Sequence, residues 1–100
     1  MIKLIINSIP EAFESRIRLA IQTALLTGPK TFKEMKEITK ATDGNLSSHL
    51  TKLEMLGYIL SSKEFLGKKP RTTYILTEKG RDSFCEYVRL LESILKSSKE

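Results

Sequence analysis

The sequence has only one cysteine and one histidine among its 100 residues, and this scarcity limits the chemistry that it can perform. A lone Cys85 cannot form an intrachain disulfide or a multi-cysteine metal site, and a lone His49 leaves the usual nucleophile–base pairs almost absent. No pair of acidic residues stands at a spacing typical of acid–base catalysis. We therefore predict that the protein is not an enzyme, with no catalytic residue, metal site or cofactor.

Long apolar runs are also missing. Nothing approaches the roughly 20 apolar residues that cross a membrane, and the apolar residues within 1–9 lack the long central region and cleavage site of a signal peptide. A hydrophobic fraction of 40% is nevertheless too high for a disordered chain. We expect a single cytoplasmic domain over residues 1–100 with no membrane partner.

The positive charge is unevenly distributed. Overall, 17 Lys and Arg face 12 Asp and Glu, a net charge of +5. Residues 30–71 hold nine basic and five acidic residues, a net of +4, whereas residues 72–100 hold five of each. A solvated basic face would be the ordinary explanation for a few extra lysines. The coincidence of this charge with the motifs described next favours a polyanionic partner instead.

Helix start and stop signals divide the first half of the chain into three segments. Ser8 and Glu11 have the spacing of a capping box before a helix over 9–27, which ends at Gly28-Pro29. Thr31 and Glu34 repeat that spacing before a short helix over 32–39, with Phe32, Met35 and Ile38 on one face. Thr42 or Asp43 caps a third helix over 43–57, whose buried stripe is Leu46, Leu50, Leu53 and Leu56.

In the second half of the chain, the helical spacing of apolar residues gives way to a strand-like pattern. Residues 58–65 and 72–76 are rich in aromatic and β-branched side chains, and the polar segment 66–71 between them holds glycine and proline, which predicts a β-hairpin with a long basic turn. Thr77 then caps a last helix over about 78–97. The fold class is therefore mainly α with a small β-hairpin: a helix-turn-helix over about 32–57 followed by a wing over about 58–76.

Two runs of residues resemble a known family. The segment TDGNLSSHLTKLE from Thr42 to Glu54, followed by Gly57-Tyr58, is similar to the recognition helix of small winged-helix transcriptional regulators related to the MarR and ArsR families. The segment GKKPRTTYILTEKGR from Gly67 to Arg81 resembles their wing and following helix. The resemblance covers roughly residues 14–90. It implies a winged helix that works as a homodimer on operator-like DNA.

The candidate DNA-binding residues lie on the outer face of the third helix and on the hairpin. Asn can read adenine edges, Ser and Thr can reach bases or phosphates, and Lys can reach guanine or phosphate. Gly44 would let the backbone approach a phosphate at the helix N-terminus. The candidates are Thr42, Gly44, Asn45, Ser47, Ser48, His49, Thr51 and Lys52 on the helix, and Lys63, Lys68, Lys69 and Arg71 on the hairpin.

The two ends of the chain have surplus apolar surface, from which we predict a homodimer. The alternative is that the N-terminal arm packs on the last helix within one chain. The candidate interface residues are Ile2, Leu4, Ile5, Ile6, Phe84, Tyr87, Val88, Leu91, Ile94 and Leu95.

Three further questions stay open at this point. A winged helix can also serve as a protein–protein docking module without DNA binding. His49, with no second ligand nearby, is expected to be a polar contact or a packed ring and not a metal ligand, and Cys85 is a small hydrophobe or a redox-sensing thiol. Whether a small-molecule effector exists cannot be predicted from these residues.

Overall fold

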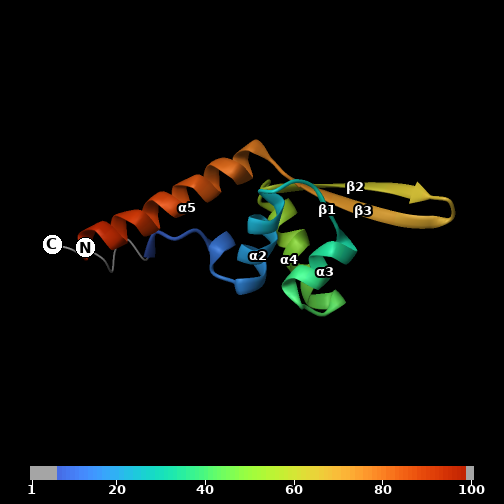
Figure 1. Ribbon diagram of the computed structural model, residues 1–100, viewed down its shortest axis with the longest axis horizontal. Helices are drawn as coiled ribbons and strands as arrows, with labels where there is room; N and C mark the ends of the chain where they lie inside the picture. Colours follow the sequence, from blue (N-terminus) through green and yellow to red (C-terminus); the bar gives the residue numbers. More distant parts are fainter. Residues whose placement is uncertain (1–6, 99–100) are drawn as a thin grey trace.

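The computed structural model describes residues 7–98, in which three α-helices pack at the base of a three-stranded antiparallel sheet and a fourth extends away from it (Figure 1). This arrangement confirms the expected winged helix-turn-helix. In chain order the elements are the 3-10 helix η1 (Glu11–Phe13), α2 (Arg16–Leu25), β1 (Lys30–Thr31), α3 (Phe32–Thr39), α4 (Asp43–Met55), β2 (Ile59–Leu66), β3 (Lys69–Leu76) and α5 (Glu78–Ser97).

The first helix differs from the sequence prediction. The expected continuous helix over 9–27 is wrong, because the chain forms η1 and then starts α2 anew after Ser15. Ser15 has an extended backbone, and its hydroxyl caps α2 by accepting a hydrogen bond from the Arg18 N–H. The expected capping box of Ser8 and Glu11 is also wrong, since the N-cap residue of η1 is Pro10, which makes no side-chain cap. The buried Gln22 amide donates to the Ala12 carbonyl oxygen at 2.9 Å and so ties η1 to α2.

The helix-turn-helix follows its start signals closely. The capping box of Thr31 and Glu34 is present at the start of α3, and Thr42 caps α4 by accepting a hydrogen bond from the Asn45 N–H. Between the helices, Lys40 adopts a left-handed conformation with φ of 59°, which ends α3. The α4 helix ends at Met55, two residues before the predicted end.

One residue predicted for the inward face of α3 is not buried. Ile38, expected on the same face as Phe32 and Met35, is 46% exposed, whereas Thr39 is fully buried. The buried hydroxyl of Thr39 accepts a hydrogen bond from the Ala41 N–H at 3.3 Å, so it helps to close the turn into α4.

The hydrophobic core lies where α2, α3 and α4 meet the first residues of β2. Leu46, Leu50 and Leu53 form the buried stripe of α4 that the sequence predicts, while the fourth predicted residue, Leu56, is only half-buried. The buried core residues are Ala12, Phe13, Ile21, Leu25, Met35, Leu46, Leu50, Leu53 and Ile59. Because this stripe holds α4 against the domain, its opposite face is left to solvent.

The sheet has the strand order β1-β3-β2. The two-residue strand β1, which the sequence analysis did not foresee, pairs Lys30 with Tyr74 and Thr31 with Thr73. The predicted six-residue turn over 66–71 is wrong, since β2 and β3 stay paired up to Leu66 and Lys69 and only two residues connect them. Gly67 has φ of 67°, the left-handed value that the first central residue of such a tight hairpin needs.

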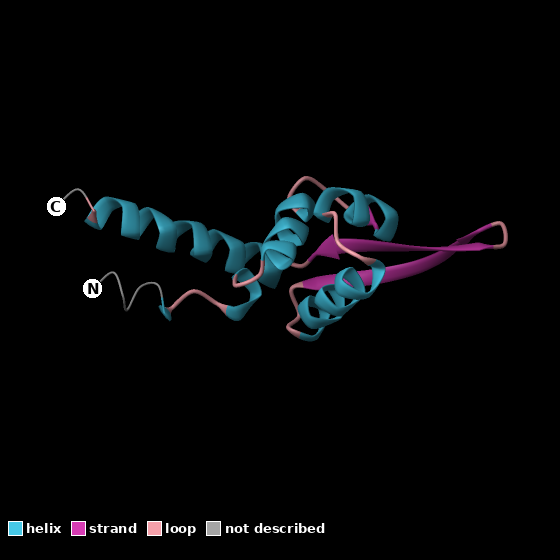
Figure 2. Ribbon diagram, turned by 90° about the horizontal axis from the view of Figure 1, so that it is seen from below, coloured by secondary structure: helices cyan, strands magenta, loops and turns pink. Residues whose placement is uncertain are grey.

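The hairpin and α5 extend from the core in opposite directions, and the molecule measures 59 × 26 × 21 Å (Figures 1 and 2). Beyond the core the hairpin is exposed on both faces. Within residues 7–98, no helix has the length and apolarity needed to span a membrane.

Candidate nucleic-acid interface

The outer face of α4 is polar and free of large side chains along most of its length. Gly44, Asn45, Ser47, Ser48 and Thr51 are all exposed. The Thr42 hydroxyl, a predicted contact, accepts the Asn45 N–H at 3.2 Å, so it caps the helix and fixes where the face begins. The resulting surface is a helix of 13 residues, about 20 Å long, which presents small donors and acceptors.

Two of the predicted residues on α4 turn toward the N-terminal part of the chain. Lys52 Nζ lies 3.2 Å from the Glu11 carboxylate, and His49 Nδ1 lies 3.3 Å from Arg18 Nη1. Arg18 also donates to the Glu11 carbonyl oxygen at 3.0 Å. The structure therefore places His49 and Lys52 beside α2 and η1, at the edge of the exposed face and not at its centre.

The surroundings of His49 favour its neutral form. Partial burial of the ring, and after it the positive charge of Arg18, lower the pKa of His49 below its usual value. A neutral ring can accept the Arg18 hydrogen bond at Nδ1. No cluster of three or more His, Cys, Asp or Glu side chains within residues 7–98 is placed to hold a metal ion.

The hairpin carries four cations, all of them exposed. Arg71 pairs with Glu64 at 2.9 Å across the two strands. Lys63, Lys68 and Lys69 form no ion pair with any residue of the described part of the chain. These three lysines therefore hold positive charge that is available to a partner.

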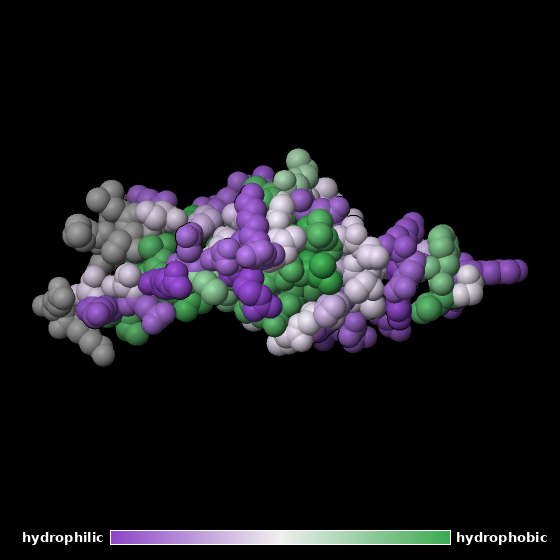
Figure 3. All heavy atoms as spheres, turned by 90° about the horizontal axis from the view of Figure 1, so that it is seen from above, coloured by the Kyte–Doolittle hydropathy of each residue, from purple (hydrophilic) through white to green (hydrophobic). Residues whose placement is uncertain are grey.

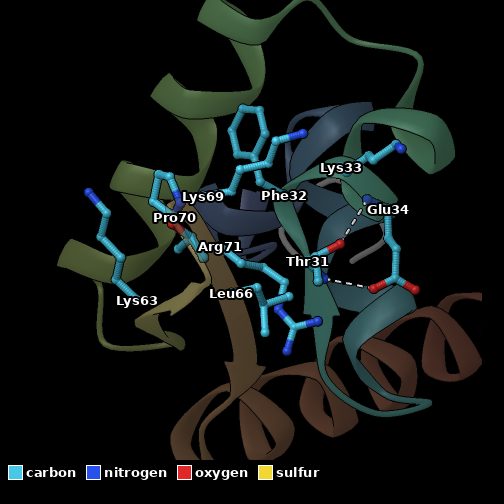
Figure 4. A pocket seen from close by; sticks show the side chains of 10 residues that line it. Thr31, Phe32, Lys33, Glu34, Lys63, Leu66, Lys69, Pro70 and Arg71 are labelled. Atoms are coloured by element: carbon cyan, nitrogen blue, oxygen red, sulfur yellow. Dashed lines mark hydrogen bonds between the residues drawn. The ribbon is translucent and has the colours of Figure 1, made fainter.

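A groove of about 850 Å³ separates the hairpin from the start of α3 (Figure 4). Its rim carries Lys33 on the α3 side and Lys63, Lys69 and Arg71 on the hairpin side, while Phe32, Leu66 and Pro70 supply apolar surface. One carboxylate, of Glu34, also lines the groove. The Thr31 backbone N–H donates to it at 2.9 Å and lowers the pKa of Glu34, so this charge is held at the helix start.

Lys33 is the main residue of this surface that the sequence analysis missed. It counted toward the basic segment but was not among the predicted DNA-binding residues. Its position in the first turn of α3, two residues after the capping residue Thr31, is the signal that could have identified it, because this turn borders the groove.

The predicted dimer residues divide into three groups. Ile2, Leu4, Ile5 and Ile6 lie outside the described residues. Phe84 and Tyr87 contact Phe13 of the same chain, with ring centroids at 5.7 Å and 4.3 Å. Ile94 is half-buried, while Val88, Leu91 and Leu95 are 40%, 42% and 63% exposed. Cys85 is exposed as well.

Comparison with known proteins agrees with this geometry. The chain matches the family model described as a winged helix DNA-binding domain over residues 17–95. It is 38% identical, over 78 residues, to an uncharacterized protein of Methanocaldococcus jannaschii, covering 76% of this chain and 84% of that protein.

Two solved structures share the fold. A transcriptional regulator homologue from Pyrococcus horikoshii superposes with a TM-score of 0.82 and 25% identity, covering 98% of this chain and 96% of that one. A structure from Enterococcus faecalis, described as a MarR-family transcriptional regulator, has a TM-score of 0.77 and 20% identity, covering 97% and 88% of the two chains.

The fold, the exposed α4 face and the basic hairpin define a winged helix-turn-helix of the transcription-regulator type. The chain belongs to the family of winged helix DNA-binding domains.

Proposed function

We propose that this protein is a homodimeric transcriptional regulator that binds double-stranded DNA in a sequence-specific manner, in the cytoplasm. The observation that carries the proposal is the exposed face of α4, made of small polar side chains, in a chain whose hairpin groove is lined by unpaired lysines. A helix of this size fits the major groove, where each base pair presents a distinct pattern of donors and acceptors.

Asn45, Ser48 and Thr51 are the proposed base-reading residues. They are exposed on successive turns of α4, and their amide and hydroxyl groups can donate to or accept from base edges. Gly44 and Ser47, at the N-terminal end of the same helix, are proposed to contact phosphate. Lys52 and His49, held at the edge of the face by Glu11 and Arg18, are proposed to contact the backbone beside the groove.

The hairpin is the proposed wing, and its groove is the proposed path of a DNA strand. Lys33 from α3 and Lys63 and Lys69 from the hairpin line the same groove, so a backbone in the groove would meet cations on both sides. Lys68 in the turn extends this contact to the flanking duplex. Such contacts set the orientation of the protein and supply affinity without reading sequence.

The proposed dimer forms through α5. Val88, Leu91 and Leu95 follow one another at intervals of three and four residues, which places them in a single apolar stripe. Twofold symmetry would then place two copies of α4 in successive major grooves. The expected binding site is a pseudo-palindrome whose half-sites lie about one helical turn, or ~34 Å, apart.

The test is selection of bound sequences from random duplex DNA at physiological salt. Recovery of a symmetric motif would support both sequence reading and the dimer. The double variant Asn45→Ala/Ser48→Ala is expected to relax sequence preference, because the bases lose their partners while the cations stay. Absence of any enrichment with the unaltered chain would contradict the proposal and favour a protein-docking module.

A further inference from the structure

The far end of the hairpin is apolar, in contrast to the charged strands behind it. Phe65 is 68% exposed and Leu66 is 55% exposed, directly before the Gly67-Lys68 turn. The space-filling view shows apolar surface near the end of the hairpin with hydrophilic surface on both sides (Figure 3). Neither residue belongs to the hydrophobic core or packs against it.

These side chains are held in fixed positions by strand pairing. Phe65 lies opposite Pro70, and Leu66 lies opposite Lys69 in the last pair before the turn. Successive residues of a strand point to opposite faces. Phe65 therefore projects from one face of the hairpin, and Leu66, which lines the groove beside α3, projects from the other.

The charges around this apolar end identify the kind of surface that it fits. Lys63, Lys68 and Lys69 lie within four residues of Phe65, and none of them has an acidic partner within the described residues. An apolar protein surface would leave three cations unpaired. The minor groove of DNA offers sugar and base surfaces between two rows of phosphates, which matches an apolar end surrounded by lysines.

The dimensions imply that such a contact changes the DNA. The minor groove of B-form DNA is about 6 Å wide, whereas sheets with side chains on their facing surfaces pack about 10 Å apart. A hairpin with apolar side chains on both faces is therefore too thick for an unaltered groove. Entry requires a wider groove, and apolar wedges produce this by partly unstacking a base step.

We propose that Phe65 is such a wedge, which enters the minor groove beside the site of α4, opens a base step and bends the duplex. Leu66 and Pro70, which both line the groove beside α3, contact the sugars of the strand that lies in this groove, and the three lysines neutralise the flanking phosphates. This inference rests on the proposed DNA binding and adds a bending step to it.

The experiment uses the full chain and a 30-base-pair duplex, about three helical turns, that carries the selected sequence and a fluorophore at each end. Energy transfer reports the end-to-end distance, and titration at several salt concentrations reports affinity. The variants are Phe65→Ala, the conservative Phe65→Leu, and Leu60→Ala as a matched control. Leu60 is 54% exposed on the same strand but lies at the base of the hairpin.

The unaltered chain is expected to bring the DNA ends together by a bend between about 20° and 90°. Phe65→Ala is expected to lose most of the bend and about tenfold in affinity, the typical effect of removing one aromatic contact to a base. Its salt dependence should not change, because no phosphate contact is lost. Phe65→Leu should retain part of the bend, and Leu60→Ala should behave like the unaltered chain.

Two failures can be told apart. An unaltered chain that binds no duplex would overturn the DNA-binding proposal together with the wedge. An unaltered chain that binds duplex, with a Phe65→Ala variant of equal affinity and equal bend, would overturn the wedge alone. Because Phe65 is exposed, the unfolding temperature of the variant should match that of the unaltered chain, which excludes misfolding as the cause of any loss.

Discussion

The β2–β3 hairpin and helix α5 both project from the helical core, but they differ in chemistry (Figure 1). Residues 59–76 hold four basic residues and one acidic residue, a net charge of +3, whereas residues 78–97 hold four of each sign. The exposed apolar residues of the hairpin lie at its far end (Phe65 and Leu66) and at its base (Leu60 and Ile75), whereas those of α5 run along the helix (Val88, Leu91 and Leu95). A polyanion fits the first projection, and a second neutral helix fits the other.

The two projections share one joint with α4. Thr77, the N-cap residue of α5, donates its N–H to the Tyr58 carbonyl oxygen at 2.9 Å and its hydroxyl to the Gly57 carbonyl oxygen at 2.7 Å. Lys79 Nζ donates to the Leu56 carbonyl oxygen at 3.0 Å. Because residues 56–58 directly follow α4, the direction of α5 relative to α4 is set at this joint. In a dimer, the same joint would set the spacing of the two α4 helices.

The largest expected effect comes from placing a charge on α5. Leu91→Glu puts a carboxylate in the centre of the exposed apolar stripe, where burial in an interface without a partner is unfavourable. We expect a monomer by analytical ultracentrifugation. We also expect affinity for a two-half-site duplex to fall about 100-fold or more, because the second half-site contact is no longer linked to the first.

The matched control is Ser93→Glu, an equally drastic charge change on an exposed residue two positions along the same helix. Ser93 lies on the face opposite Val88 and Leu95, so its variant should stay dimeric and bind normally. If the Leu91→Glu and Ser93→Glu chains dimerise equally well, α5 is not part of the dimer interface. The two projections would then not have the separate roles proposed.

The second largest effect is expected from a substitution at the joint between α4 and α5. A Cβ at Gly80 would lie 2.3 Å from the Tyr58 carbonyl oxygen and 2.8 Å from Leu76 Cδ1, so Gly80→Ala must displace the start of α5. We expect the free energy of unfolding to fall by about 1–3 kcal/mol, measured by urea denaturation.

Gly44→Ala provides the matched comparison for this substitution. It adds the same methyl group on α4, where nothing lies within 4 Å. This second variant should be neutral or more stable by up to about 1 kcal/mol, since alanine favours a helix. If Gly80→Ala and Gly44→Ala lower the free energy of unfolding by the same amount, this would contradict the close approach of Gly80 to the Tyr58 carbonyl oxygen.

The helix-turn-helix was predictable because its signals are local. Thr31 and Glu34 form the expected capping box, Thr42 starts α4, and the leucines of α4 show the correct period. The break before α2 was not predictable by the same means. Ser8 and Ser15 are both serines ahead of a helical pattern, and only the packing of η1 through Gln22 distinguishes which of them starts α2.

The hairpin and the groove depend on contacts between distant residues. Pro70 and Gly67 suggested a long turn, but pairing of Phe65 with Pro70 and Leu66 with Lys69 extends the strands almost to their end. Proline is tolerated there because β1 pairs only with Thr73 and Tyr74, which leaves one side of β3 open at Pro70. Lys33 joins the hairpin lysines only after β1 has brought α3 alongside β3.

A smaller effect is expected from single lysines on the hairpin. Lys68→Ala should weaken binding to all duplex sequences and reduce the salt dependence of the binding constant by about one counterion, because one phosphate contact is lost. Arg71→Ala should have less effect on DNA, since Arg71 is already paired with Glu64. Lys96→Ala, an exposed lysine on α5, serves as the control. A salt dependence of Lys68→Ala equal to that of the control would exclude the turn from the interface.

The smallest expected effect concerns the region between the two projections, where His49 of α4 meets Arg18 of α2. The pKa of His49 is lowered, so between about pH 7 and pH 5 the unfolded chain binds more protons than the folded chain. The stabilisation that comes from neutral His49 should therefore be fully present above the usual pKa of histidine. It should be lost as the pH falls through the lowered pKa of His49. Urea denaturation at about pH 7, 6 and 5 measures this decrease.

The variant His49→Gln removes the titrating group and should flatten this dependence. Glu34, whose pKa is also lowered, loses its contribution only as the pH falls below its usual value of 4.5, so the two groups affect different pH ranges. An equal pH dependence for His49→Gln and the unaltered chain would show that the Arg18–His49 contact does not couple protonation to folding. Protonation of His49 would then make no contribution to holding α4 against α2, which would rest on the buried Leu46, Leu50 and Leu53 and on the Lys52–Glu11 ion pair.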